Sequence, residues 1–106
     1  MITRITRGRV RTNAEGLAVE RLRAAIRDSP SPPAGLVHFS LSRRNEGDCV
    51  ELVAITVWED AESMADALGP DWQSVAWSPS IIELMEASST EMLETVVETL
   101  DRLTTE

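Results

Sequence analysis

A chain of 106 residues has room for one domain, and its 42% hydrophobic content is ordinary for a globular protein. Its net charge of -8 argues against nucleic-acid partners and anionic membranes, because both require a basic surface. One cysteine, Cys49, excludes an intramolecular disulfide and a thiolate metal cluster, and the sequence contains neither a leader-like segment nor an apolar run of about 18 residues. We therefore expect a single cytoplasmic domain, 1–106, with no membrane span and no metal.

The N-terminal part of the chain predicts a strand followed by a helix. Residues 2–11 alternate Ile, Thr and Val with other side chains, as strands do. In residues 15–28 the apolar side chains recur at helical spacing, with Asn13 as the expected N-cap. Pro30 and the prolines after it end this helix, because proline disfavours a helical residue before it.

A hairpin and a second helix follow. Residues 36–43 alternate apolar and polar side chains, and the small and polar residues 45–48 are typical of a tight turn. In residues 50–58 both alternating sets are apolar, which predicts a central strand covered on both faces. Asp60 is the expected cap of a helix that ends at Gly69.

The C-terminal third of the chain is more ambiguous. Two fragments within residues 71–88 have helix-like spacing, whereas residues 91–100 fit both a strand and a helix. We favour a strand for 91–100, because β-branched residues are frequent there and because the first strand would otherwise be an exposed edge. The order is then that of a ferredoxin-like split βαβ fold, an α+β fold with a four-stranded antiparallel sheet, whose last strand pairs with the first. Cross-strand ion pairs are expected between the arginines and the acidic residues of these two strands: Arg4, Arg7 and Arg9 with Glu91, Glu94, Glu98 and Asp101.

Two segments carry a resemblance to a known family. One is GLVHFSLSR, with the spacing G-x-x-x-F-x-L-x-R from Gly35 to Arg43, and the other is ELVAITVWEDAESMADAL, in which the strand leaves through a Trp-Glu-Asp exit at Trp58. Together with a closing strand after a short helical region, they make nearly the whole chain resemble the antibiotic biosynthesis monooxygenase family. The resemblance implies a homodimer in which two four-stranded sheets pack face to face as a dimeric α/β-barrel, with a pocket on each subunit between sheet and helices.

The haem-degrading branch of that family uses an asparagine, a tryptophan and a histidine. By alignment the asparagine position is Thr6, the tryptophan position falls near Asp66 or Ala67, and the histidine position falls between Val75 and Trp77. None of the three residues is present. Since an axial imidazole is the usual haem ligand in this setting, we do not expect haem degradation.

The cofactor-independent branch of the family places tryptophan, asparagine, arginine and tyrosine around a polycyclic phenol. This chain has no tyrosine but does have tryptophans and arginines. The resemblance then implies a small apolar or aromatic ligand and no cofactor. Two interpretations stay open: a cofactor-independent monooxygenase acting on aromatic or polyketide-like compounds, and a non-catalytic binding or structural dimer of the same fold.

No residue is assigned a catalytic role, but five are candidates for ligand binding. His38, the only histidine, is either a base near neutral pH or a hydrogen-bonded imidazole without a catalytic role. The indole planes of two tryptophans suit flat ligands and suit core packing equally. An arginine keeps its charge when half buried and can grip a carboxylate. The five candidates are Arg4, Thr6, His38, Trp72 and Trp77.

Overall fold

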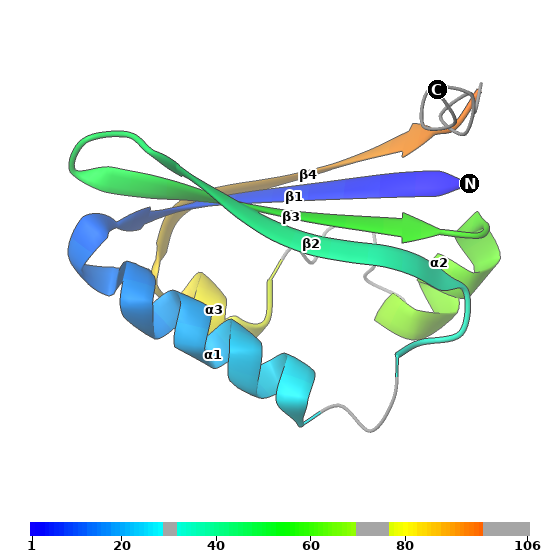
Figure 1. Ribbon diagram of the computed structural model, residues 1–106, viewed down its shortest axis with the longest axis horizontal. Helices are drawn as coiled ribbons and strands as arrows, with labels where there is room; N and C mark the ends of the chain where they lie inside the picture. Colours follow the sequence, from blue (N-terminus) through cyan, green and yellow to red (C-terminus); the bar gives the residue numbers. More distant parts are fainter. Residues whose placement is uncertain (29–31, 70–76, 97–106) are drawn as a thin grey trace, which may run out of the picture.

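The protein forms two layers, a sheet and a set of helices that cover one of its faces (Figure 1). The computed structural model describes residues 1–28, 32–69 and 77–96. Its single sheet has four strands in the order β2-β3-β1-β4, and every neighbouring pair is antiparallel. This is the ferredoxin-like α+β arrangement that the sequence predicts. The elements are β1 (Ile2–Arg11), the 3-10 turn η1 (Thr12–Ala14), α1 (Glu15–Arg27), β2 (Leu36–Asn45), β3 (Cys49–Trp58), α2 (Ala61–Leu68), α3 (Pro79–Ile82) and β4 (Met85–Glu94).

Side chains along the strands alternate between the face that the helices cover, here called the covered face, and the opposite, open face. On β1, Val10 is fully buried on the covered face, whereas its neighbour Arg9 is exposed on the open face. The main core lies where α1 and α3 approach the sheet. It consists of Val10, Ala18, Val50, Leu52, Trp77 and Ile81.

The apolar strand β3 is central, as its sequence predicts, because it pairs with β2 on one side and with β1 on the other. The expectation that both of its faces are covered holds for one face only. Among the described residues, helices lie against the covered face alone (Figure 1). The apolar side chains that β3 places on the open face are therefore not covered by these helices.

The last strand differs from its prediction. β4 spans Met85–Glu94, so residues 85–88, which have helix-like spacing, form part of a strand. Its ladder with β1 contains an irregularity between Arg9 and Val10, and Met85 lies over Gly8 there. A Cβ atom on residue 8 would come within 2.8 Å of Trp77 Nε1, so a glycine lets Trp77 and Met85 approach the strand. The end of the predicted strand, residues 97–100, lies outside the described residues.

Two other expectations also need correction. The N-cap of α1 is Ala14, which makes no side-chain capping bond, and Asn13 lies in the preceding 3-10 turn. Of the expected ion pairs between β1 and β4, Arg7 bonds Glu91 across the strands, whereas Arg9 bonds Glu46 of the β2–β3 hairpin at 3.2 Å. Arg4 lies on the covered face, and Glu98 and Asp101 lie outside the described residues.

The predicted cap of α2 is confirmed and gives a pH-dependent prediction. Asp60 accepts a hydrogen bond from the backbone N–H of Ser63 at 2.8 Å, and this bond lowers the pKa of the Asp60 carboxyl. Because the folded-state pKa lies below the unfolded value, the carboxylate stabilises the fold above the unfolded pKa, and the effect is lost as the pH falls through the folded pKa. We expect Asp60→Ala to lower the melting temperature at pH 7, with a difference that shrinks in acid.

The control is Asp60→Asn, which keeps a capping acceptor and removes the charge. This variant should lose less stability than Asp60→Ala at pH 7. Melting curves recorded from neutral to acidic pH test both variants. An Asp60→Ala deficit that stays constant over that range would contradict the cap assignment.

Candidate functional site

A band of polar side chains crosses the middle of the covered face, between the core under α1 and the end of the sheet near α2. It occupies two adjacent rows of residues that face one another across the strands in the order β4, β1, β3, β2. One row consists of Thr90, Thr6, Ala54 and Leu41, and the other row consists of Met92, Arg4, Thr56 and Phe39. Four of these eight residues are polar, and they are adjacent; we call Arg4, Thr6, Thr56 and Thr90 the polar band.

The two members of the polar band on β1 are almost completely buried. Arg4 is 7% exposed and Thr6 is 2% exposed. Burial lowers the pKa of the Arg4 guanidinium, yet arginine stays charged at neutral pH because its ordinary pKa is so high. The covered face therefore holds a buried guanidinium group beside Thr6.

The hydroxyl groups of the band have different partners. Thr56 Oγ1 accepts a hydrogen bond of 2.9 Å from Trp58 Nε1, so the buried indole of Trp58 holds the Thr56 side chain in place. Thr90 Oγ1 is buried, and the part of the chain that the structure describes offers it no hydrogen-bond partner. Thr90 stands directly opposite Thr6 in the ladder of β1 and β4.

Two of the four polar-band residues, Arg4 and Thr6, are among the candidates predicted from the sequence. The other two, Thr56 and Thr90, are not. Arg4 and Thr6 are two residues apart on one strand, so they share a face whatever the strand pairs with. Thr56 and Thr90 join them only through the register of β1 with β3 and β4. The placement of the last strand at residues 91–100 leaves Thr90 outside it, so no signal in the sequence alone identifies this residue.

The other candidate residues lie elsewhere. Trp77 is 6% exposed within the main core, and its Nε1 atom donates a hydrogen bond of 3.4 Å to the Arg7 carbonyl. His38 is exposed on the open face, opposite Val57, so the sheet separates it from Arg4 and Thr6. Trp72 lies outside the described residues.

The positions that align with the tryptophan of the haem-degrading branch lie on a helix of this structure. Asp66 and Ala67 lie on α2, where the helix and the segment before β2 enclose a hollow of about 290 Å³. The hollow is lined by Pro33, Ala34, Ser63, Asp66 and Ala67. No aromatic side chain is among these lining residues.

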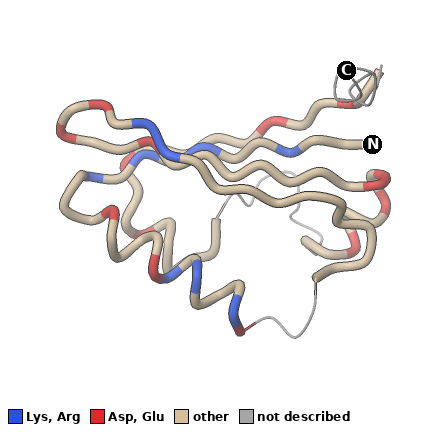
Figure 2. The backbone as a smooth tube through the Cα atoms, viewed as in Figure 1, with Lys and Arg blue, Asp and Glu red and all other residues tan. Residues whose placement is uncertain are grey.

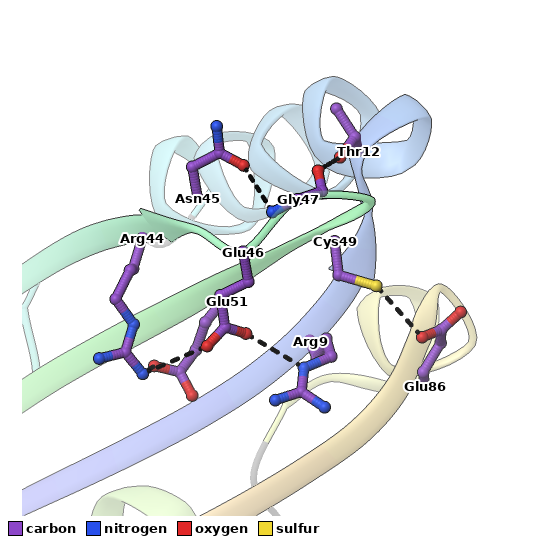
Figure 3. Close-up of polar contacts among 9 residues, drawn as sticks. All are labelled: Arg9, Thr12, Arg44, Asn45, Glu46, Gly47, Cys49, Glu51 and Glu86. Carbon is purple, nitrogen blue, oxygen red and sulfur yellow. Dashed lines mark hydrogen bonds and ion pairs between the residues drawn. The ribbon is translucent and has the colours of Figure 1, made fainter.

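The open face is divided into an apolar and a charged part. The apolar part lies toward the start of β1 and contains Ile5, Val53, Ile55, Val57 and Leu93, of which Leu93 is 50% exposed. The charged part lies toward the β2–β3 hairpin, where arginines and glutamates from several strands alternate (Figures 2 and 3). Its ion pairs are Arg7–Glu91, Arg9–Glu46, Arg11–Glu86, Arg44–Glu46 and Arg44–Glu51.

Cys49 belongs to the charged part of the open face. Its Sγ atom lies 3.4 Å from Glu86 Oε2 (Figure 3). Burial raises the pKa of the Cys49 thiol, and the hydrogen bond to Glu86 raises it further. A thiol in this environment is a poor nucleophile, because the reactive species is the thiolate.

Within residues 1–28, 32–69 and 77–96, no group of three or more His, Cys, Asp or Glu side chains could hold a metal ion. None of the helices formed by these residues is long and apolar enough to cross a membrane.

Searches with family models and with curated protein sequences find no match. Solved structures do match. A putative antibiotic biosynthesis monooxygenase from Nitrosomonas europaea superposes with a TM-score of 0.67 at 14% identity, covering 92% of this chain and 100% of that chain. A mutant form of SnoaB, a cofactor-independent oxygenase from Streptomyces nogalater, matches with a TM-score of 0.59 at 25% identity, covering 92% of this chain and 94% of that one.

The haem degrader MhuD from Mycobacterium tuberculosis, with two haems bound in its active site, superposes with a TM-score of 0.56 at 21% identity and covers 93% of this chain and 99% of that chain. Both an oxygenase without a cofactor and a haem-degrading enzyme are thus among the similar structures, so the likeness fixes the architecture and leaves the chemistry to the residues of the site. The chain has the fold of the antibiotic biosynthesis monooxygenase family.

Proposed function

We propose that this chain forms a cytoplasmic homodimer whose two subunits each bind a small aromatic or apolar molecule on the covered face, over the polar band. The observation that carries the proposal is the burial of Arg4 and Thr6 within the polar band, on the same sheet face as the apolar main core. Ligand pockets combine apolar walls with a few precisely placed polar groups, and this band has that composition. Met92, Ala54, Leu41 and Phe39 supply the apolar surface beside it.

The apolar part of the open face supports the homodimer. Three residues of β3, Val53, Ile55 and Val57, lie side by side with Ile5 and Leu93 on that face. A contiguous apolar patch on a small protein marks an interaction site, since its burial removes unfavourable contact with water. A second copy placed sheet to sheet covers all five residues.

The charged part of the open face favours a second copy as the partner. Its ion pairs join four arginines, Arg7, Arg9, Arg11 and Arg44, to four glutamates, Glu46, Glu51, Glu86 and Glu91, so the charges of this part cancel. The whole chain carries -8, so most other surfaces of two copies repel each other. The open face combines charge balance with apolar area, so two copies can meet there without net repulsion.

The positive charge of the site indicates what the protein does to its ligand. A phenol or enol bound beside Arg4 is stabilised as its anion, because the buried guanidinium favours negative charge there. An electron-rich anion of this kind can be oxidised by molecular oxygen without a metal or a flavin. We therefore propose a cofactor-independent oxidation as the activity, with Arg4 as the group that stabilises the anion.

Oxygen uptake with a panel of anthrones and quinols tests this activity. We expect wild-type protein to consume oxygen with at least one compound, and Arg4→Met to slow the reaction by about 100-fold or more, as loss of a charge-stabilising donor does in other active sites. The matched control is Arg23→Met on α1, where Arg23 is exposed; it should leave uptake unchanged. No uptake across the panel would contradict the oxidation.

The second candidate function is binding without turnover. It is favoured by the absence of tyrosine from the sequence, since the cofactor-independent branch employs one. Saturable binding of the same compounds without oxygen uptake would support this alternative. Absence of both binding and uptake would contradict the ligand site itself.

A further inference from the structure

The open face is ordered in rows that cross the sheet, with one residue from each strand in the order β4, β1, β3, β2. Three successive rows bear on how two copies can meet, and each is named here after its residue on β1. The Ile5 row consists of Glu91, Ile5, Ile55 and Ser40, the Arg7 row of Ser89, Arg7, Val53 and Ser42, and the Arg9 row of Ala87, Arg9, Glu51 and Arg44. The centre of the face thus changes from apolar to charged along the strands.

A dimer with two-fold symmetry can join two such faces in two ways. If the symmetry axis runs along the strands, each row meets the same row of the partner with the order of the strands reversed. If the axis crosses the strands at the Arg7 row, the Arg9 row of one copy meets the Ile5 row of the other.

The axis across the strands is the less favourable of the two. It presses the charged side chains of Arg9 and Glu51 onto the apolar side chains of Ile5 and Ile55, and burial of charges against apolar groups is costly. Moving this axis away from the charged part avoids that contact, but it leaves the Arg9 row uncovered and buries less area. An axis along the strands avoids both costs.

An axis along the strands also places opposite charges across from each other. With the axis at the centre of the sheet, each residue of β1 faces its own β3 ladder partner in the other copy. Ile5 then faces Ile55 of the partner subunit, Arg9 faces Glu51 of the partner subunit, and each contact forms twice. Aligned sheets cross at about 30°, which displaces a row next to the crossing point by about 4 Å, less than the spacing of the strands.

Arg9 has both the donors and the room for a second carboxylate. Its bond of 3.2 Å to Glu46 uses Nε (Figure 3), and a guanidinium group has five N–H donors, so its two Nη groups can bond a further oxygen. A hollow of about 200 Å³ lies on the open face at this point, lined by Arg9 together with Arg7, Ala87 and Ser89, among others. A carboxylate that enters this hollow approaches two guanidinium groups.

We propose that the two copies meet with the symmetry axis along the strands, and that Arg9 of each copy pairs with Glu51 of the partner subunit across the interface. This inference rests on the proposed function, since it takes the homodimer as given. It adds the orientation of the copies. The charged part of the open face then fixes the register of the interface, as complementary charges do in other complexes.

Exchange of charges between chains tests the pairing. Arg9→Glu and Glu51→Arg each place like charges opposite one another twice, so the dissociation constant of each homodimer should rise by about 100-fold or more. An equimolar mixture of the two variants should form a heterodimer, because every side chain at positions 9 and 51 then faces the opposite charge. Native mass spectrometry distinguishes the heterodimer from the homodimers, and melting curves show whether each variant is folded.

The matched control reverses an ion pair outside the open face. Arg21 of α1 pairs with Glu83, which follows α3, and both helices lie on the covered side of the sheet (Figure 1). Arg21→Glu and Glu83→Arg should each dimerise as tightly as the wild type.

Cross-linking through exposed serines tests the orientation without a change of charge. Ser42 and Ser89 lie at opposite edges of the Arg7 row, about 14 Å apart within one chain. In a Cys49→Ser background, a chain with both Ser42→Cys and Ser89→Cys should be joined to its partner by a short bismaleimide, and neither single cysteine variant should be. An axis across the strands at the Arg7 row would instead bring each serine against its own copy, so the single variants would cross-link.

Three results would overturn the inference. Arg9→Glu and Glu51→Arg homodimers as tight as the wild type would place the charged part outside the interface. Folded variants that stay monomeric when mixed, or cross-linking of the single cysteine variants, would show another orientation; in all these cases the homodimer itself still stands. A monomeric wild type would overturn both the inference and the homodimer. If the charge reversals fail to fold, the cysteine variants decide the orientation.

Discussion

Replacement of Ile55 by aspartate is expected to convert the proposed dimer into a folded monomer. Ile55 lies in the apolar part of the open face, opposite Ile5 on β1 and Ser40 on β2. In a sheet-to-sheet dimer each subunit would bury one unpaired carboxylate, and an uncompensated buried charge costs about 3–5 kcal/mol. Because the dimer would bury two such carboxylates, the dissociation constant should rise by at least about 10,000-fold.

Light scattering or sedimentation equilibrium measures this change. Wild-type protein should have twice the chain mass of 11.7 kDa, and Ile55→Asp should have the single mass at micromolar concentration. The control is Leu17→Asp on α1, where Leu17 is 48% exposed and lies away from the open face. A wild type that is monomeric, or an Ile55→Asp variant that stays dimeric, would contradict the dimer proposal.

Truncation of Trp77 to alanine is expected to destabilise the protein by about 3–5 kcal/mol, the usual loss for a buried tryptophan. Trp77 lies in the main core with Val10, Val50 and Ile81, and Gly8 gives it room to approach the sheet. Its removal leaves a cavity and breaks the hydrogen bond of its Nε1 atom to the Arg7 carbonyl. Urea unfolding at equilibrium measures the loss.

Trp77→Phe serves as the control for the size of the side chain, since it retains most of the packing and lacks the indole N–H. Its loss of stability should be clearly smaller than that of Trp77→Ala. The contrary outcome is a stable Trp77→Ala variant with weakened ligand binding. It would mean that the tryptophan forms a wall of the ligand site rather than part of the core.

The elements that the sequence predicts well are those whose signal is local. β1 begins and ends where its alternation of side chains begins and ends, and α2 starts after the cap Asp60 and ends at Gly69. Capping and alternation depend on residues a few positions apart, so they can be identified before anything is known of the rest of the fold. The fold class follows from the order of such elements.

The position of β4 could not be predicted in this way. Residues 85–90 are Met, Glu, Ala, Ser, Ser and Thr, which lack the alternation of apolar and polar side chains typical of a strand. They form a strand because β1 offers them a free edge and because Met85 packs over Gly8. Both causes are contacts between residues far apart in the sequence.

In the candidate site, too, some residues are predicted by local spacing and others are placed only by contacts between distant strands. Arg4 and Thr6 share a face by their spacing alone, whereas Thr90 reaches them only through the observed register of β4. The separation of His38 from these residues also depends on register, including the irregularity between Leu36 and His38 in the ladder of β2 with β3. The register of each strand depends on the whole sheet. The sequence alone can therefore predict individual candidate residues, but it cannot predict which residues of different strands lie side by side.

The location of the bound ligand is the most direct test of the account, and methyl-group NMR with 2-naphthoate can determine it. We predict that the methyl signals of Thr6, Thr90 and Met92 on the covered face shift on titration, while those of Ile55 and Val57 on the open face do not. Shifts confined to the open face, or no shifts at all, would contradict a ligand site over the polar band.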